Sequence, residues 1–264
     1  MVVRTRRFLA TVTIMLLALV GGAVTTAAAP AVDYVALGDS YSSGVGAGSY
    51  GDSGNCKRSS NAYPELWADS HPVSDFEFAA CLGARTSDVI SQASVLDAGT
   101  TLVTLSVGGN DAGFTDVMID CTLGTDQQCV DRVATAKDYA TTTLPGLLDD
   151  VYATVTANAP NAEVIVLGYP RFYEIGGSCR AGLSDTKRSA INSGADTLAE
   201  VTAQRAAAAG VTFVDVRGHF DGHEICSDGE WWLHSLTWPA DESYHPTAAG
   251  QASGYLPALE SVTG

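Results

Sequence analysis

The stretch YVALGDSYSSG, residues 34–44, joins a short apolar run to a cluster of small polar residues. Its β-branched and aromatic start predicts a buried strand, which we expect over residues 33–37. Gly38 ends that strand and leaves Ser40 on a turn beyond its carboxyl end. Ligands and reacting groups collect at this edge of open α/β sheets. The stretch therefore predicts either a nucleophilic serine or simply a strand followed by a loop of small residues.

Four more runs are expected as strands, and helical stretches separate them. Three of these runs are apolar and rich in β-branched residues, and the fourth, residues 76–80, alternates briefly between apolar and polar residues. The clearest is TLVTLSV at residues 101–107, which two glycines end. Strands that alternate with helices form parallel sheets, so the pattern predicts an α/β fold, a three-layer sandwich with a five-stranded parallel sheet. The other three predicted strands cover residues 76–80, 162–167 and 211–216.

Some element boundaries have specific signals. We expect Thr86 to be the N-cap of a helix that ends near Gly99. Pro246 is expected in the first turn of a last helix, residues 247–259. Residues 217–244 show little periodicity and are expected as a long structured loop.

Residues 1–29 have the pattern of a secretory signal peptide. Arginines precede an apolar run from Phe8 to Val20, and small residues before Pro30 offer a cleavage site. The run is short for a membrane span, although an uncleaved anchor is the alternative. We expect residues 30–264 to form one secreted, extracellular domain with no stable membrane insertion. The general and the twin-arginine export routes both stay open.

The composition is strongly acidic. The chain has 30 acidic and 14 basic residues, a formal charge of −16. Loss of residues 1–29 removes three arginines and no acidic residue, which leaves −19. Such a chain repels the phosphates of nucleic acids, so we expect no nucleic-acid partner. We also expect a monomer that uses neither a metal nor a cofactor, because the sequence has no metal-ligand cluster and no Gly-rich phosphate loop.

The six cysteines are expected to form three disulfides, because their number is even and the compartment is oxidising. Six cysteines permit 15 pairings. We expect sequential pairing, in which each bridge closes one loop between neighbouring elements. A zinc site is the alternative, but the spacings are irregular and C-x-x-C is absent. The expected pairs are Cys56–Cys81, Cys121–Cys129 and Cys179–Cys226.

Three further residues stand where a serine hydrolase needs them. Gly83 follows the second predicted strand, and Asn110 follows the third. Because the carboxyl ends of parallel strands share one edge, both can meet Ser40 there. His245 precedes Pro246, which favours an extended backbone and a ring that projects from a loop. Taken singly, each residue has a simpler explanation than catalysis: the glycine as a turn residue, the asparagine as a turn or cap residue, and the histidine as a surface residue.

Together, these blocks resemble the SGNH (GDSL-type) hydrolase family. GDSYSSG at residues 38–44 is similar to the nucleophile block, and Gly83 to the glycine of the second block. GGND at residues 108–111 is similar to the third block, and His245 to the histidine of the last. The match runs from Asp33 to the end of the chain and is strongest to secreted actinobacterial lipases, esterases and phospholipases. It implies the sheet order 2-1-3-4-5, and it also implies the sequential cysteine pairing.

The resemblance implies a role for each of these residues. Ser40 would be the nucleophile, and His245 the general base that later protonates the leaving alcohol. The oxyanion hole would consist of the N–H groups of Ser40 and Gly83 and the side chain of Asn110.

One position departs from the family pattern. An aspartate is expected three residues before the histidine, where this chain has Glu242. Either the longer carboxylate orients His245, or the backbone carbonyl of Ser243 does so, as in some secreted members of the family. Both arrangements fix the tautomer whose other ring nitrogen faces Ser40. We prefer the carbonyl, and the choice stays open at this point.

The leading interpretation is a secreted serine carboxylic-ester hydrolase, a lipase or esterase whose substrates can include phospholipids, that acts through a Ser-His centre and an acyl-enzyme. Its substrates would be lipids or small soluble esters, and Trp231 and Trp232 are candidates for lining an acyl groove, with loop packing as their simpler role. A carbohydrate O-acetylesterase is one alternative. A catalytically silent secreted binding module is another, from a different functional class.

Overall fold

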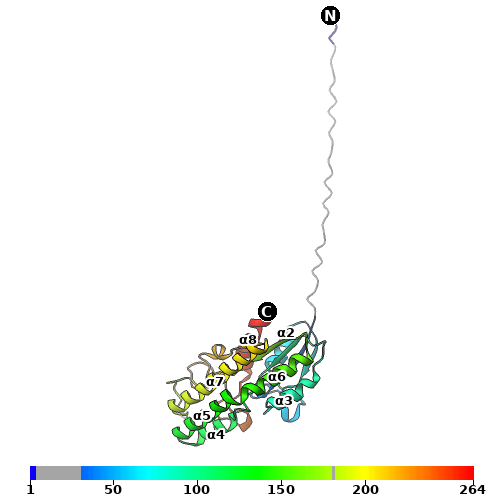
Figure 1. Ribbon diagram of the computed structural model, residues 1–264. Coiled ribbons are helices and arrows are strands. Elements are labelled where there is room, and N and C mark those ends of the chain that lie inside the picture. Colours follow the sequence, from blue (N-terminus) through cyan, green and yellow to red (C-terminus); the bar gives the residue numbers. More distant parts are fainter. Residues whose placement is uncertain (4–30, 180–181) are drawn as a thin grey trace. The chain divides into compact units, whose positions relative to one another are not determined.

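In the computed structural model, which describes residues 1–3, 31–179 and 182–264, five parallel strands form one sheet in the order β2-β1-β3-β4-β5 (Figure 1). The predicted sheet and its order are therefore confirmed. Residues 4–29 of the predicted signal peptide lie outside the described residues. The strands are β1 (Val32–Ala36), β2 (Val73–Phe78), β3 (Leu102–Leu105), β4 (Glu163–Leu167) and β5 (Thr212–Val214).

The centre of the sheet is apolar because helices cover both of its faces. All four residues of β3 are buried, as expected for a central parallel strand. On β1, the fully buried Tyr34 packs edge-on against Trp67 and stacks on Phe76. Its hydroxyl shares a hydrogen bond of 2.7 Å with Thr104 of β3, so this buried polar group is satisfied.

The helices form two layers, with an extension at one end. α6 packs against both α3 and α7 on one face, and α2 and α8 pack together on the other. α5 packs along α7, and α4 packs against α5 (Figure 1). The bounds are α1 (Ser40–Ser43), α2 (Tyr63–Ser70), α3 (Thr86–Gln92), α4 (Phe114–Leu123), α5 (Asp126–Thr142), α6 (Leu144–Asn158), α7 (Asp185–Ala209) and α8 (Leu256–Thr263).

Some boundaries differ from the predictions. Thr86 is the first residue of α3 instead of its N-cap, and α3 ends at Gln92 instead of near Gly99. Pro246 does not lie in the first turn of the last helix, because its backbone pairs with Leu233 in an isolated bridge. The helix that follows contains a π-helical stretch, Gly250–Tyr255, before α8. These tertiary contacts override the local capping signals.

The three predicted disulfides are present with the predicted pairing. They join Cys56 to Cys81, Cys121 to Cys129 and Cys179 to Cys226. The second of these connects α4 to α5. Within the described part of the chain, no helix combines the length and the apolar composition that crossing a membrane requires.

Gly38 allows the chain to leave β1 in the direction that places Ser40. Its φ is +121°, a region that side chains rarely adopt. Its N–H and C=O both bond the Gln92 side-chain amide, at 2.7 and 3.0 Å. A Cβ at this position would lie 2.7 Å from the Ser106 carbonyl oxygen. Only glycine therefore fits between β1 and the end of β3.

Replacement of Gly38 by alanine is expected to lower the free energy of unfolding by about 3 kcal/mol, because a steric clash adds to an unfavourable φ. Gly48→Ala is the matched control: its φ is also positive, +70°, but no described atom lies within 4 Å of its Cβ position. The control is expected to lose about 1 kcal/mol. Urea unfolding measures both variants, and equal losses would contradict this account of Gly38.

Candidate active site

Ser40 lies at the carboxyl edge of the sheet, on the first residue of the one-turn helix α1. Asp39 caps this turn by accepting the Tyr41 N–H at 3.0 Å. Gly44 ends it in the left-handed conformation, with φ +81°. The local sequence thus makes a sharp turn that presents the serine hydroxyl just beyond β1.

The structure brings Ser40 and His245 into direct contact. Ser40 Oγ and His245 Nε2 are 2.7 Å apart, although 205 positions separate the two residues in the chain. His245 Nδ1 lies 3.1 Å from the Ser243 carbonyl oxygen. A carbonyl oxygen only accepts, so Nδ1 carries the proton and Nε2 presents its lone pair to the serine hydroxyl. Burial lowers the pKa of His245 to about 4, which keeps the ring neutral at pH 7.

A tight turn aims the Ser243 carbonyl at the ring. The His245 N–H donates to the Glu242 carbonyl at 3.3 Å and closes a four-residue turn. Ser243 has φ −58° and ψ 136°, and Tyr244 has φ +65°, which are values of a type II turn. Glycine is usual at the position of Tyr244, because a side chain there costs about 1–2 kcal/mol.

Three hydrogen bonds hold Tyr244 in this conformation. Its hydroxyl shares a bond of 2.8 Å with Thr122 at the end of α4. Its carbonyl accepts the Tyr41 hydroxyl at 2.7 Å, and its N–H donates to the His234 carbonyl at 3.0 Å. The residue next to the serine therefore also supports the turn that orients the histidine.

Glu242, the other candidate for orienting His245, makes its contacts elsewhere. Its carboxylate accepts the Tyr50 hydroxyl at 2.7 Å. Lys57 Nζ lies 3.8 Å from the same oxygen and 2.7 Å from Asp241. Of the two groups that the sequence left open, the structure places the Ser243 carbonyl against the imidazole.

Asn110 and Gly83 come from two neighbouring loops. Asn110 lines the same pocket as Ser40, and its Nδ2 donates to the Ala84 carbonyl at 2.9 Å. An amide nitrogen has two protons, so one remains for a ligand. Gly83 is exposed with φ +78°, and no described atom lies within 4 Å of its Cβ position, so approach to its backbone is open.

Sequence reasoning missed a buried carboxylate beside the serine. Asp39 is 1% exposed and accepts the hydroxyls of Ser106 at 2.7 Å and Tyr169 at 2.5 Å. Burial raises its pKa to about 6, and these hydrogen bonds oppose that shift. Ser106 follows β3 and Tyr169 follows β4, so Asp39 ties three strand ends together. Its position next to Ser40 was the only available signal.

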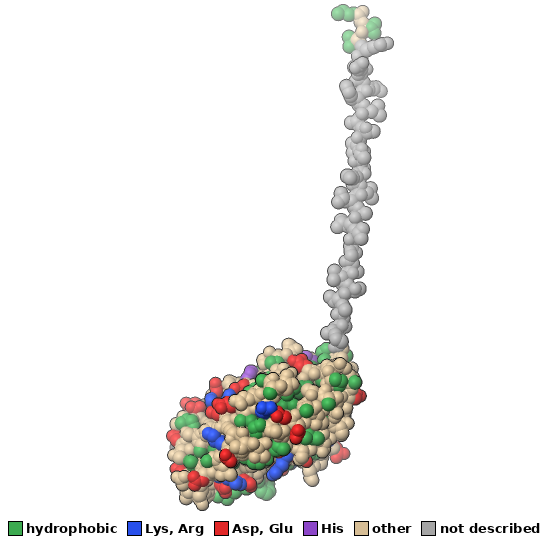
Figure 2. All heavy atoms as spheres, in the orientation of Figure 1, with side chains coloured by type: hydrophobic (Ala, Val, Ile, Leu, Met, Phe, Trp, Pro, Cys, Tyr) green, Lys and Arg blue, Asp and Glu red, His purple; other side chains and the backbone are tan. Residues whose placement is uncertain are grey.

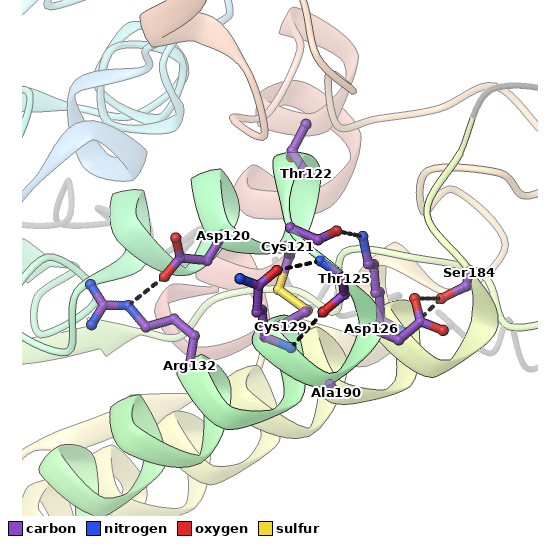
Figure 3. The surroundings of a disulfide bond; sticks show 12 residues. Asp120, Cys121, Thr122, Thr125, Asp126, Cys129, Arg132, Ser184 and Ala190 are labelled. Carbon is purple, nitrogen blue, oxygen red and sulfur yellow. Dashed lines mark hydrogen bonds and ion pairs between the residues drawn. A yellow bond between two sulfur atoms is a disulfide. The ribbon is translucent and has the colours of Figure 1, made fainter.

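An apolar pocket extends from Ser40 between α4, α5 and α7. The Cys121–Cys129 disulfide joins α4 to α5, two of the three helices that line the pocket (Figure 3). Asp126 of α5 accepts a hydrogen bond from the hydroxyl of Ser184, which precedes α7 (Figure 3). Lining residues include Phe114 and Val117 of α4, Val133 and Ala136 of α5, and Ile191 and Leu198 of α7.

The suggestion that Trp231 and Trp232 line this pocket is wrong. Trp232 stacks on His223 with ring centroids 3.6 Å apart, and it meets Phe220 edge-on. Trp231 Nε1 donates to the Ser227 carbonyl at 3.0 Å. Both indoles therefore pack within the segment 217–244. The irregular sequence of this segment gave no indication of these contacts.

Comparisons with known proteins agree with this arrangement. Residues 36–252 match the model of the GDSL-like Lipase/Acylhydrolase family. Lipase 1 of Streptomyces coelicolor is 59% identical over 250 residues, which cover 93% of this chain and 92% of that protein. Two crystal structures, phospholipase A1 from Streptomyces albidoflavus NA297 and the extracellular lipase from Streptomyces rimosus, each superpose with a TM-score of 0.85. Each is 56% identical, and the match covers 88% of this chain and 99% of theirs.

The imidazole of His245 is expected to take up its proton near pH 4, because burial disfavours the charged ring. The shift is downward, so the ring stays neutral through the range in which a free histidine, with a pKa near 6.5, becomes charged. Imidazole NMR signals followed from pH 3 to pH 8 measure this, and His245→Asn identifies the resonance by its loss. A midpoint near pH 6.5 would contradict the buried site.

Proposed function

Because the chain belongs to the GDSL-like lipase/acylhydrolase family and is a lipolytic carboxylic-ester hydrolase, we propose that Ser40 and His245 carry out its reaction through an acyl-enzyme. The 2.7 Å contact between Ser40 Oγ and His245 Nε2 supports this most directly. It is within the reach that a general base needs to take the serine proton.

In the first half of the reaction, Ser40 Oγ bonds to the acyl carbon while its proton passes to His245 Nε2. The C–O bond to the alcohol then breaks, and the proton on Nε2 goes to the leaving oxygen. In the second half, the oxygen of a water molecule bonds to the acyl carbon while one of its protons passes to Nε2. The bond between the acyl carbon and Ser40 Oγ then breaks, the acid leaves, and the proton on Nε2 goes to Ser40 Oγ. His245 ends neutral and Ser40 regains its proton, so the site is restored.

Negative charge develops on the former carbonyl oxygen in both halves. We assign its stabilisation to the N–H groups of Ser40 and Gly83 and to the free amide proton of Asn110. The open approach at Gly83 and the position of Asn110 in the pocket support this assignment. Loss of one such donor typically lowers turnover by about 10²–10³.

The Ser243 carbonyl takes the place of a third catalytic side chain. Its 3.1 Å contact with Nδ1 supports a Ser-His dyad. The carbonyl dipole orients the ring and faces the positive charge that forms when Nε2 is protonated. Among the described residues, the carboxylate of Glu242 contacts Tyr50 and Lys57 instead of the imidazole.

Acyl lipids and soluble short esters are the substrates that we assign to this site. The pocket beside Ser40 is lined mainly by apolar side chains from three helices, which suits an acyl chain longer than acetyl. This favours a lipase over a carbohydrate O-acetylesterase. Three disulfides support export, with residues 1–29 as the signal peptide.

A panel of esters from acetyl to palmitoyl, together with phosphatidylcholine, tests this function. The parent protein is expected to cleave esters with acyl chains beyond acetyl, and Ser40→Ala to lose at least 10³-fold in kcat/KM. Ser43→Ala is the matched control on the same helical turn, because its hydroxyl makes only a 3.4 Å contact with the Ser40 carbonyl.

A fluorophosphonate probe adds a covalent readout, since it labels activated serines. It is expected to label the parent and Ser43→Ala but not Ser40→Ala. Activity restricted to acetyl esters would favour the O-acetylesterase. No labelling and no hydrolysis by the folded parent protein would favour the binding module.

A further inference from the structure

Four large apolar side chains are exposed close to the catalytic turn. On α4, Leu123 is 82% exposed and Ile119 is 49% exposed. In the segment before His245, Trp238 is 87% exposed and Leu236 is 65% exposed. We call these four residues the apolar rim. Side chains of this size are usually at least partly covered, so their proximity to one site requires a reason.

Hydrogen bonds attach both halves of the apolar rim to the turn that orients His245. Thr122, which precedes Leu123, shares its hydroxyl bond with Tyr244. Thr237, between Leu236 and Trp238, donates its N–H to Ser243 Oγ at 3.0 Å and accepts from that hydroxyl at 3.3 Å. The end of α4 lies beside the orange segment that contains this turn (Figure 1).

The two basic side chains near the apolar rim, Arg132 and Lys57, are paired with carboxylates. Asp116 and Asp120 of α4 contact Arg132, at 2.7 and 3.4 Å. Asp241, three residues after Trp238, contacts Lys57. Basic groups are therefore engaged by carboxylates, and acidic side chains outnumber basic ones in the whole chain, as on the face shown in Figure 2. Such a surface has no attraction for anionic head groups.

We propose that the apolar rim is a docking surface for zwitterionic phospholipid assemblies, which brings the turn that orients His245 close to the lipid. The proposal rests on the proposed function, because an acyl lipid must leave its assembly to reach Ser40. Apolar side chains enter the boundary between head groups and acyl chains, and exposed tryptophan is suited to that boundary. The hydrogen bonds from Thr122 and Thr237 keep the lipid contact close to the turn that orients His245. The catalytic residues themselves take no part in the lipid contact.

Vesicles of ether-linked phosphatidylcholine test docking separately from hydrolysis, since they contain no carboxylic ester for the enzyme to cleave. The double variant Leu123→Ser/Trp238→Ser is expected to bind at least tenfold more weakly than the parent protein, by sedimentation of the vesicles, because two apolar side chains leave the lipid. The matched control is Val95→Ser/Val262→Ser, which removes two exposed apolar side chains elsewhere, 43% and 38% exposed. It is expected to bind like the parent.

Hydrolysis of a water-soluble short ester by each variant shows that the fold and the active site are intact, and it is expected to stay within twofold of the parent. Equal vesicle binding by the parent and the double variant would overturn the proposal, as would no vesicle binding by the parent. Tighter binding to anionic vesicles than to zwitterionic vesicles would also overturn the proposal. A change of oligomeric state in the double variant without a change in vesicle binding would overturn it as well, because it would identify the apolar rim as a self-association face. Failure to hydrolyse any ester would count against the proposed function alone, since the ether-lipid measurement does not use it.

Discussion

The hydrogen bond from His245 Nδ1 to the Ser243 carbonyl is the constraint on which the rest of the site depends. It sets the tautomer, and the tautomer directs the lone pair of Nε2 to Ser40 at 2.7 Å. Its acceptor belongs to the backbone, so its position depends on a peptide plane instead of a side-chain rotamer. That plane is held by Tyr244 at φ +65°, a conformation that neighbouring side chains must stabilise.

The fold supplies that stabilisation from distant parts of the chain. Tyr41, beside the serine, and Thr122, at the end of α4, both bond Tyr244. Asp39 meanwhile joins the ends of β1, β3 and β4 through Ser106 and Tyr169. Displacement of the turn that contains Ser243 and Tyr244 would therefore break bonds to α1 and to α4. These hydrogen bonds explain how the buried imidazole of His245 keeps its orientation when a backbone carbonyl, instead of a carboxylate, accepts from Nδ1.

Local sequence patterns and the family resemblance together predicted most of the fold. The apolar strands, the serine after β1, the sheet order and the disulfide pairing could be stated in advance, the order from the family resemblance. Thr86 and Pro246 were misplaced because capping signals are weak against tertiary contacts. The sequence allowed only a preference for the Ser243 carbonyl over Glu242. The contact that engages the Glu242 carboxylate comes from Tyr50, which lies 192 positions away and has no sequence signal for it. Asp39 was overlooked because its partners follow other strands.

The most direct measurement of the central claim is kcat/KM for Glu242→Ala on a water-soluble ester. Tyr50→Phe serves as the control, because it removes the same hydrogen bond and keeps the carboxylate. If the Ser243 carbonyl orients His245, both variants should stay within about tenfold of the parent protein and resemble each other. A fall of about 10³-fold or more for Glu242→Ala, with Tyr50→Phe near the parent, would contradict the account, because it is the loss typical of a catalytic carboxylate.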